Sequence, residues 1–463
     1  MSFTTIIFYC WLAVAVVLFY LIPAKFRVSF ILVISCVFYL TISPRYLVLM
    51  LVLTFIVFQT GRGLRQAQSE TSRTLLLIAG IFPVLGSLIV FKFGGSLSQW
   101  LLPIGISYYS FKLISYVVEV YWEPSNAVGS IVEFASYVTF GPQMISGPIQ
   151  RPCDYFSQLK RQREGGTDYA RIEDGMRLIL GGLLLKMLIG DRLADFVGLV
   201  DKNPAAYTRP VVLLSTLCYA IQLYADFAGY TNIALGIGKL FGIDGPANFN
   251  APFAAANIQN FWRRWHMSLT TWLTDYVFMP MRMSTRTLGA AGLAASIVTT
   301  FVLVGVWHGF YWTFLVFGLL HGIFMTVSAL TLHMRDRFFK GTPESVRRTR
   351  AALGIVSTYL LVTFSQIWFW APSVGAAIFR IKQLAGVVPS GLLSLTDIKA
   401  DISLPLFACI PIAFYLGAGS PGFRRWWAPV GGFIPNWALY GAGMLALSLM
   451  TTESGSKFIY GQF

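Results

Sequence analysis

The chain has 463 residues, of which 56% are hydrophobic and only 12% are charged. A soluble globular protein carries about 25% charged residues, so this composition excludes a soluble multidomain enzyme, and it equally excludes disorder, coiled coil and collagen. The formal net charge of +15 is spread over short basic loops without a long basic run. That distribution is typical of membrane proteins and argues against a nucleic-acid partner.

Long apolar runs follow one another along almost the whole chain. A membrane-spanning helix needs about 17–25 mostly apolar residues, and runs near this length lie at 4–24, 28–43, 46–60, 74–92, 101–121, 178–200, 210–242, 288–307, 311–332, 351–371, 403–419 and 434–451. They predict an all-α polytopic membrane protein with about 11–12 transmembrane helices, built as one integral-membrane domain over 1–463. Because several glycines interrupt the run at 210–242, we expect that helix to be broken.

The distribution of basic residues predicts the orientation of the chain. Lys25 and Arg27 follow the first apolar run, and no charged residue precedes it. The positive-inside rule therefore places the N-terminus outside. With alternating spans, the basic clusters at 151–177 and 335–350 then fall on the cytoplasmic side.

A proline-rich stretch at 131–152 does not fit as a span. Pro142, Pro148 and Pro152 lie within eleven residues of one another, and proline breaks a helix interior because it lacks an N–H group. In lipid, such backbone persists only where protein or a water-filled cavity satisfies it. We therefore expect a re-entrant or horizontal element that enters from the cytoplasmic side.

The stretch at 257–283 has the pattern of an amphipathic helix. Large apolar residues recur at alternating intervals of three and four, and they are Trp262, Trp265, Leu269, Trp272 and Tyr276. This spacing places them on one helical face, with basic residues beside it. We expect an interfacial helix whose tryptophans lie at the depth of the lipid headgroups.

The chain contains four histidines, and His321 occupies the most unusual position. It lies about ten residues into the run at 311–332, which is about 15 Å deep in a hydrocarbon core of roughly 30 Å. An ionisable group at that depth indicates a functional site, and a neutral imidazole suits a general base near pH 7. A neutral imidazole that joins two helices by hydrogen bonds fits the same position, so both interpretations stay open.

The other ionisable candidates have weaker signals. His308 ends the run before a Gly309 turn that can fold two helices together and bring His308 near His321. We expect a structural or cofactor-side role for His266, and an ordinary interfacial position for His333. Asp226 lies within an apolar run, where an internal ion pair or helix cap is expected. No metal-ligating cluster or CxxC motif is present, so the residues alone fit a membrane transferase or a proton-coupled transporter.

Four blocks of the sequence together resemble the membrane-bound O-acyltransferase family. They are PIGISYYSFKLISYVVEVYW at 103–122, GPQMISGPIQRPCDYFSQL at 141–159, YADFAGYTNIALGIGKLFGI with NFWRRWHMSLTTWLTDYVFMP across 224–280, and VGVWHGFYWTFLVFGLLHG at 304–322. Within the family, the chain is most similar to the bacterial branch of alginate O-acetyltransferases and teichoic acid D-alanyl transferases. The length and the block around WRRWH favour the alginate-like group that acetylates polysaccharides.

The resemblance implies a fold and a set of site residues. The fold is a ring of helices around a thin central catalytic wall, with the family core at about 101–335. His321 matches the essential histidine of the family, and His308 matches the accompanying histidine of the WHG motif. The cofactor is expected to be bound by four further residues, which are Arg151, Arg263, Arg264 and His266.

The resemblance also implies a reaction in the bacterial cytoplasmic (inner) membrane. An acetyl group would pass from cytoplasmic acetyl-CoA, without a metal, to an exopolysaccharide outside through an extracytoplasmic partner protein. After VFMPM, however, the chain reads RMSTRTLG, where alginate acetylases have a Gly-Gly-Asn-Arg type of stretch. Acetylated cellulose or another exopolysaccharide therefore stays open as the product. Lipid or D-alanyl transfer, and proton-coupled transport, are the alternatives.

Overall fold

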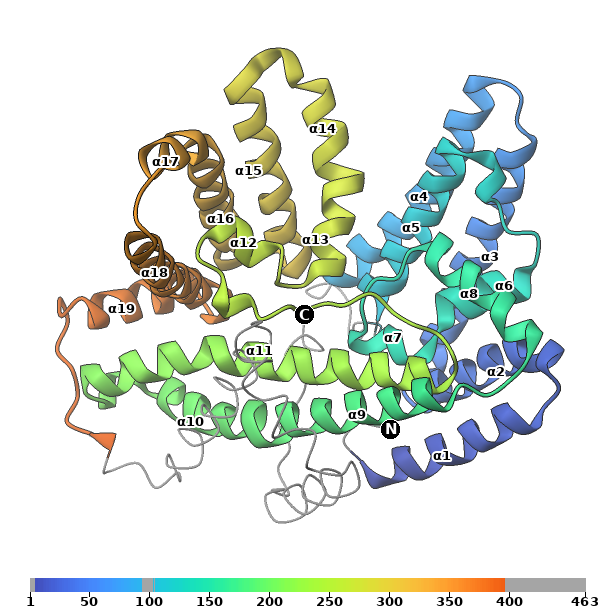
Figure 1. Ribbon diagram of the computed structural model, residues 1–463, viewed down its shortest axis with the longest axis horizontal. Coiled ribbons are helices and arrows are strands. Elements are labelled where there is room, and N and C mark those ends of the chain that lie inside the picture. Colours follow the sequence, from blue (N-terminus) through green and yellow to red (C-terminus); the bar gives the residue numbers. More distant parts are fainter. Residues whose placement is uncertain (1–4, 94–102, 104, 396–463) are drawn as a thin grey trace. The chain divides into compact units, whose positions relative to one another are not determined.

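The computed structural model describes residues 5–93, 103 and 105–395, whose helices are drawn in Figure 1. These residues form two compact units, one from 5–183 with 229–246 and the other from 184–228 with 247–395. The predicted runs at 403–419 and 434–451 lie outside the described residues. The single domain over 1–463 stays a prediction.

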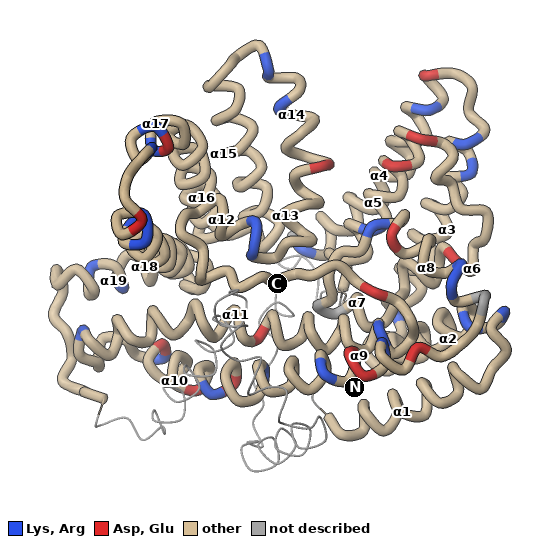
Figure 2. Tube along the Cα trace, in the orientation of Figure 1, with Lys and Arg blue, Asp and Glu red and all other residues tan. Residues whose placement is uncertain are grey.

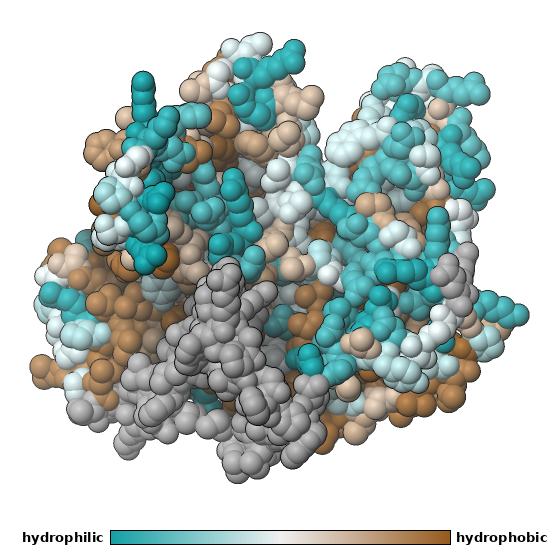
Figure 3. Space-filling view, viewed as in Figure 1, coloured by the Kyte–Doolittle hydropathy of each residue, from teal (hydrophilic) through white to brown (hydrophobic). Residues whose placement is uncertain are grey.

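In the first unit, the helices α1 to α5 lie close to the first five predicted apolar runs, whereas α6 to α9 do not follow a predicted run. The helices of this unit are α1 (Ile6–Leu21), α2 (Arg27–Leu40), α3 (Pro44–Gln66), α4 (Glu70–Phe93), α5 (Ile106–Trp122), α6 (Ile131–Thr139), α7 (Gly141–Ser146), α8 (Pro152–Glu164) and α9 (Tyr169–Leu184). Apolar side chains on α1, α3 and α4 face outward, including Ile6, Val14, Val48, Phe55 and Phe82, and hydrophobic surface follows α1 in Figure 3. Such surface needs lipid around it, because contiguous exposed apolar area of this extent is rare in soluble proteins.

The helices that follow α9 are of very different lengths. They are α10 (Asp191–Lys202), α11 (Arg209–Leu240), α12 (Ile258–Trp262), α13 (Met267–Leu273), α14 (Met279–Ser284), α15 (Gly289–His308), α16 (Trp312–Leu330), α17 (Leu332–Phe338), α18 (Glu344–Trp370) and α19 (Val374–Leu384).

Six helical segments of the described chain are long and apolar enough to cross a membrane. They are Pro44–Gln66, Glu70–Lys92, Arg209–Leu240, Arg286–His308, Trp312–Leu330 and Glu344–Trp370. The described residues contain no β-strand, only an isolated bridge between Tyr207 and Leu393. The chain is therefore an all-α polytopic membrane protein, as the sequence predicts.

The predicted break in the run at 210–242 is wrong, because α11 is one continuous helix of 32 residues. Its glycines serve close packing against α9 instead. A Cβ atom on Gly182 would lie 2.6 Å from the carbonyl oxygen of Gly229, and one on Gly175 would lie 2.8 Å from that of Gly236. Small residues allow helix backbones to approach in this way in membranes. The two helices therefore pack with almost no side chain between them at these points.

Gly242 ends α11 rather than interrupting it. It has a φ of +71°, and the Ile243 N–H donates to the Gly238 carbonyl oxygen over 2.9 Å. The Gly242 N–H donates to the Lys239 carbonyl oxygen over 3.0 Å. This pair of bonds is the Schellman arrangement, which satisfies carbonyl groups at a helix C-terminus and favours glycine at the left-handed position.

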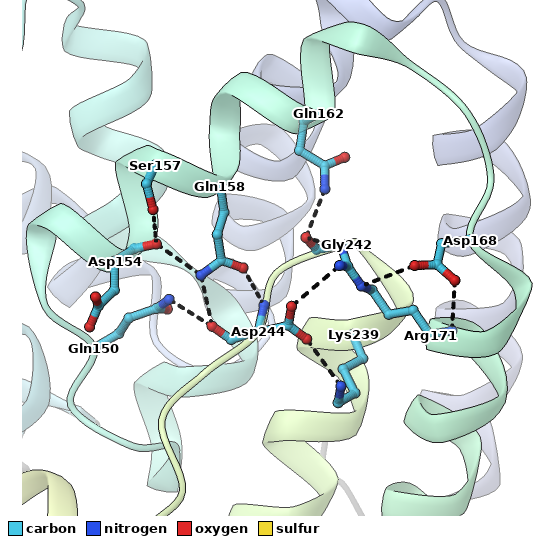
Figure 4. A network of polar contacts seen from close by, with 10 residues as sticks. All are labelled: Gln150, Asp154, Ser157, Gln158, Gln162, Asp168, Arg171, Lys239, Gly242 and Asp244. Carbon is cyan, nitrogen blue, oxygen red and sulfur yellow. Dashed lines mark hydrogen bonds and ion pairs between the residues drawn. The ribbon is translucent and has the colours of Figure 1, made fainter.

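The segment that follows α11 is held by polar side chains of α8 and α9, as Figure 4 shows. Gln158 binds Asp244 twice, donating to its carbonyl oxygen over 2.9 Å and accepting its N–H over 2.6 Å. Gln162 donates to the carbonyl oxygen of Gly242 over 2.8 Å. The Asp244 carboxylate pairs with Lys239 at 3.1 Å and with Arg171 at 3.5 Å. These contacts fix the backbone at 242–244 relative to α8 and α9.

The proline-rich stretch at 131–152 is interrupted, as the sequence predicts. It forms two short helices, α6 and α7, followed by non-helical backbone up to Arg151. Buried side chains replace the missing helical bonds. Tyr137 donates its hydroxyl to the Gln150 carbonyl oxygen over 2.9 Å, and Gln150 donates its side-chain N–H to the Asp244 carbonyl oxygen over 2.9 Å. Its entry from the cytoplasmic side stays a prediction.

The single interfacial helix predicted at 257–283 is wrong. The stretch consists of α12, a turn at His266, α13, a π-helical turn (Thr274–Phe278) and α14. Trp262, Trp265 and Trp272 are buried within the protein and do not face headgroups. The regular spacing of the apolar residues arises because they face the protein interior. The backbone turn at His266 does not change that spacing, so the sequence pattern does not indicate it.

Candidate active site

The helices α15 and α16 form a tightly packed hairpin that carries two of the four histidines. Gly305 and Gly318 leave no room for a Cβ, because each faces the backbone of the other helix at Phe314 and Phe301. The turn at 309–311 therefore folds the two helices against each other, as the sequence predicts. It places His308 at the end of α15 and His321 in the middle of α16.

His321 is 1% exposed and is held by hydrogen bonds on both ring nitrogens. Nδ1 accepts the indole N–H of Trp262, from α12, over 3.2 Å. Nε2 lies 2.8 Å from the Ser365 hydroxyl of α18, and that hydroxyl donates to the Val362 carbonyl oxygen over 2.7 Å. Since an indole N–H can only donate, Nδ1 carries the lone pair. The proton then lies on Nε2 and is donated to Ser365.

This arrangement joins α12, α16 and α18 through one neutral imidazole. It is the helix-bridging role that the position of His321 allows, and it also orients the ring. An imidazole in this tautomer offers a lone pair at Nδ1 to any hydroxyl that replaces the Trp262 N–H. The bridging geometry and a base role are therefore compatible.

Aromatic rings enclose both histidines of the hairpin. Phe317 contacts both, with ring centroids 4.7 Å from His321 and 6.1 Å from His308. His308 is 6% exposed and packs edge-on against Phe369 of α18 at 4.8 Å. The hairpin thus brings the two histidines to one apolar cluster, where electrostatic interactions are weakly screened.

His266 lies at the turn between α12 and α13, outside the candidate membrane spans. It has a φ of +42°, and its Nδ1 lies 3.0 Å from Oδ1 of Asn248. Oδ1 of Asn248 also accepts the Ser268 hydroxyl over 2.8 Å. Burial lowers the pKa of His266 to about 3. The side chain is therefore neutral and supports the turn, and its expected contact with the cofactor stays a prediction.

The basic residues expected to bind the cofactor have different surroundings. Arg263 is exposed and Arg264 is half-buried, both at the turn after α12, and Arg264 reaches the Ala251 carbonyl oxygen at 3.5 Å. Arg151 occupies the N-cap position of α8 in the first unit, and its side chain makes no capping hydrogen bond. Their role as cofactor ligands stays a prediction. His333, on α17, is exposed, as expected for an interfacial residue.

Asp226 forms the internal ion pair that its position in an apolar run predicts. Its carboxylate lies 2.7 Å from Nζ of Lys186, which also binds Asp191. All three side chains are at least 92% buried. Lys186 lies in a π-helical turn (Leu185–Gly190), and Gly190 packs against the backbone of Asp226. One cation thus links the helix that contains this turn to α11.

Sequence reasoning missed both partners of His321. The pattern at 257–283 predicts Trp262 at the depth of the lipid headgroups, and Ser365 lies within the apolar run at 351–371. The available signal was a polar pair, Ser365 and Gln366, within the otherwise apolar run at 351–371. A polar side chain at that depth needs a partner inside the protein.

Comparison with known proteins gives a consistent set of relatives. The sequence profile of the membrane-bound O-acyltransferase family matches residues 98–369, more than half of the chain. The chain is 29% identical to the probable alginate O-acetylase AlgI of Azotobacter vinelandii, over 89% of this chain and 82% of that one. It is 26% identical to the peptidoglycan O-acetyltransferase of Helicobacter pylori, over 76% and 72% respectively. It is 34% identical to the teichoic acid D-alanyltransferase of Bacillus subtilis, over 44% and 53%.

Proposed function

Since the chain belongs to the membrane-bound O-acyltransferase family and is an acyltransferase, we propose that it passes an acetyl group from cytoplasmic acetyl-CoA across the membrane for O-acetylation of an exopolysaccharide. The product is an alginate- or cellulose-like polymer. Its setting is the bacterial cytoplasmic membrane. Acetyl-CoA is charged and does not cross lipid. A membrane enzyme that transfers only the acetyl group can therefore deliver it to an acceptor on the other side.

The observation that carries this proposal is the orientation of His321. The imidazole is neutral, is enclosed by aromatic rings and has its lone pair at Nδ1. A general base needs such a lone pair within hydrogen-bond reach of the hydroxyl it deprotonates. An acceptor hydroxyl takes the place of the Trp262 N–H at Nδ1.

The acceptor oxygen attacks the thioester carbonyl carbon while its proton passes to Nδ1 of His321. The C–O ester bond forms, the C–S bond breaks, and the departing thiolate takes the proton from the imidazolium. Ser365 stabilises the imidazolium by accepting its Nε2–H, and His308 orients the donor or the acceptor. No metal is required by these steps.

A partner protein outside the cytoplasm is the proposed route to the polymer. Relatives named for alginate and peptidoglycan O-acetylation support a polysaccharide as the final acceptor. A second candidate is D-alanyl transfer, which the teichoic acid relative favours. Membership of an acyltransferase family favours either enzyme over a proton-coupled transporter.

The test compares donors and follows the polymer. Purified full-length chain in nanodiscs receives radiolabelled acetyl-CoA or an activated D-alanyl donor, with the candidate partner present, and label transfer is measured. In the producing cell, acetyl esters on the exopolysaccharide should disappear on deletion. They should return with the wild-type gene but not with His321→Ala. Unchanged esters after deletion would overturn the proposal, and transfer of D-alanine alone would establish the second candidate.

A further inference from the structure

Four polar side chains are buried where α11 and α18 meet in the second unit. They are Ser215 and Gln222 of α11 and Thr363 and Gln366 of α18, and none is more than 7% exposed. Their two hydroxyl oxygens and two amide Oε1 atoms have no hydrogen-bond partner among the described residues. Because an unpaired polar atom in a protein interior is costly, a bound molecule is expected beside them.

Two contacts show which face of α18 is directed at α11. Tyr359 donates its hydroxyl to a backbone carbonyl oxygen of α11 over 2.7 Å. The Trp370 ring stacks on the Tyr219 ring of α11, with centroids 4.6 Å apart. Thr363 and Gln366 lie between these two contact residues at intervals of three and four positions. They are therefore on the same face of α18, which meets α11.

The unpartnered residues of α11 flank the same contact. Ser215 lies four residues before Tyr219, and Gln222 lies three residues after it. This spacing places all three on one helical face, and the stacking of Tyr219 shows that this face is directed at α18. The four polar side chains thus share one contact region, which we call the α11–α18 polar site.

The hydroxyls of Ser215 and Thr363 differ from others on the same two helices. Thr216 of α11 donates to the carbonyl oxygen four residues earlier over 2.7 Å, and Thr358 of α18 does the same over 2.7 Å. Serine and threonine in membrane helices commonly satisfy their hydroxyls in this way. A buried hydroxyl without this bond is available to a molecule outside its own helix.

The four groups suit a neutral ligand that carries hydroxyl groups. An amide oxygen only accepts hydrogen bonds, whereas a hydroxyl both donates and accepts. A carboxylate also only accepts, so it cannot bind the amide oxygens, and burying its charge needs a cation. Arg380, which lies over the Trp370 ring, is already paired with Asp201. A ligand hydroxyl can bind all four groups without any charge.

The α11–α18 polar site lies beside both histidines of the candidate active site. Gln366 directly follows Ser365, whose hydroxyl is 2.8 Å from Nε2 of His321. Phe369, three residues after Gln366, packs edge-on against His308 at 4.8 Å. An acceptor whose reacting hydroxyl meets His321 can therefore bring its other hydroxyls to this site.

The site also lies towards the side of the membrane on which the acceptor is expected. Figure 2 shows Lys and Arg on α17 and at the start of α18, an end that the positive-inside rule places in the cytoplasm. Thr363 lies 13 residues after Arg350, which is about 20 Å along the helix axis. This distance extends past the middle of a hydrocarbon core of roughly 30 Å.

We propose, on the basis of the proposed function, that the α11–α18 polar site binds hydroxyl groups of the acceptor and selects a neutral polyhydroxyl chain. The site fits a glucan of the cellulose type better than a polyuronate of the alginate type, because its four groups carry no charge. The partner protein presents the polymer to this site. Thr363 and Gln366 are then positioning residues, which act on the affinity for the acceptor rather than on the thioester.

The experiment compares a neutral acceptor probe with an anionic one. Full-length protein in nanodiscs receives acetyl-CoA with either cellobiose or a disaccharide of mannuronic acid, and the acetyl ester formed on each sugar is measured. The wild type should prefer cellobiose. Thr363→Val and Gln366→Met should each lower kcat/KM for cellobiose by roughly tenfold, mainly through a higher KM, as expected for one lost hydrogen bond.

Thr358→Val is the matched control. Thr358 is as buried as Thr363, at 4% exposed, and lies on the same helix. Its hydroxyl is satisfied within α18, so its loss should leave the KM for cellobiose unchanged. Thermal melts of all three variants show whether each protein is folded before its kinetics are compared.

Cellobiose binding measured without a donor separates this proposal from the proposed function. Binding that weakens in Thr363→Val but not in Thr358→Val supports the site even if the wild type releases no thiol from acetyl-CoA, in which case the proposed function is wrong. No binding to the wild type, a preference for the mannuronate probe, or acetyl transfer to the partner protein alone would overturn the proposal. Equal binding and equal KM in all variants would also overturn it, since ordered water would then satisfy the four groups.

Discussion

Trp262 donates its indole N–H to Nδ1 of His321 over 3.2 Å, which joins two residues 59 positions apart in the sequence. Because Ser365 lies 2.8 Å from Nε2 on the other side of the ring, the imidazole is fixed in one tautomer. The ring is therefore oriented before any substrate arrives, which reduces the reorganisation needed in the reaction.

Replacing His321 by Ala should reduce acetyl transfer by about 10²–10⁴-fold, the usual contribution of general acid–base catalysis. The protein should still fold, because the substitution removes hydrogen bonds worth about 1 kcal/mol each. Transfer rates and thermal melts of the purified protein check both points. His333→Ala, at an exposed site on α17, is the control and should keep its activity. A well-expressed His321→Ala protein with near-normal transfer would contradict the catalytic assignment.

Replacing Trp262 by Phe should remove the preference of His321 for the tautomer with its proton on Nε2. Phenylalanine keeps an aromatic ring in the cluster but removes the indole N–H that donates to Nδ1. Nitrogen-15 spectra of histidine-labelled protein should show Nε2–H for His321 in the wild type and a mixture in the variant. Stability should fall by about 1 kcal/mol. Trp265→Phe, in the same aromatic cluster, should leave the His321 signals unchanged, and identical spectra for Trp262→Phe would refute the assignment.

Replacing Lys186 by Met should destabilise the protein by about 3–5 kcal/mol, because it leaves buried carboxylates without their shared cation. The double variant with Asp226→Asn should recover part of the loss, since one of the two like charges is then gone. Thermal melts in detergent measure both. Lys202→Met, at an exposed position on α10, should melt like the wild type. If Lys186→Met does so too, the buried ion pairs do not stabilise the fold.

Gly182 and Gly181 form a matched pair on α9. A Cβ on Gly182 would lie 2.6 Å from the Gly229 carbonyl oxygen, whereas a Cβ on Gly181 meets no atom within 4 Å. Gly182→Ala should therefore destabilise the protein by about 1–3 kcal/mol through overpacking. Gly181→Ala should be neutral or stabilising by up to about 1 kcal/mol, because alanine favours helix. Melting temperatures in the opposite order would show that α9 and α11 do not pack at Gly182.

Protonation of His266 should make stability depend on pH. Its pKa is about 3 in the folded protein and 6.5 ordinarily, so below pH 6.5 the unfolded chain binds a proton that the folded one does not. The contribution of neutral His266 to the free energy of unfolding is fully present above pH 6.5. Between pH 6.5 and pH 3, that free energy falls by up to about 1.36 kcal/mol per pH unit. His266→Asn does not titrate there and tolerates a positive φ, so its melts from pH 7 to pH 5 should be flatter. Equal slopes would contradict this prediction.

The bounds of a helix could be predicted closely from the sequence where hydropathy determines them. They could be predicted less well where packing against another helix determines them. The runs at 288–307 and 311–332 agree with α15 and α16 within one or two residues. By contrast, the glycines of α11 indicate a break when the sequence is considered alone. They are tolerated because α9 packs against them, a contact that no local pattern reveals.

The candidate site could likewise be predicted only in part. The depth of His321 in an apolar run indicates that it needs partners, but not which ones. Trp262 and Ser365 come from helices that meet only in the folded chain. The turn at His266 was equally hidden, because a left-handed residue in a helical pattern changes the backbone without changing the spacing of apolar residues.

The contacts around Gly242 and Asp244 also bear on how the protein is made. The first unit consists of 5–183 and 229–246. The residues between these two segments, which form α10 and the first part of α11, belong to the second unit. They are synthesised before residues 229–246 complete the first unit. Gln158 and Gln162 can therefore bind the backbone of Gly242 and Asp244 only after the C-terminal end of α11 has been synthesised and inserted into the membrane. A nascent chain that stops at α9 lacks the backbone groups that these amides bind, so the two units are completed in interleaved order rather than one after the other.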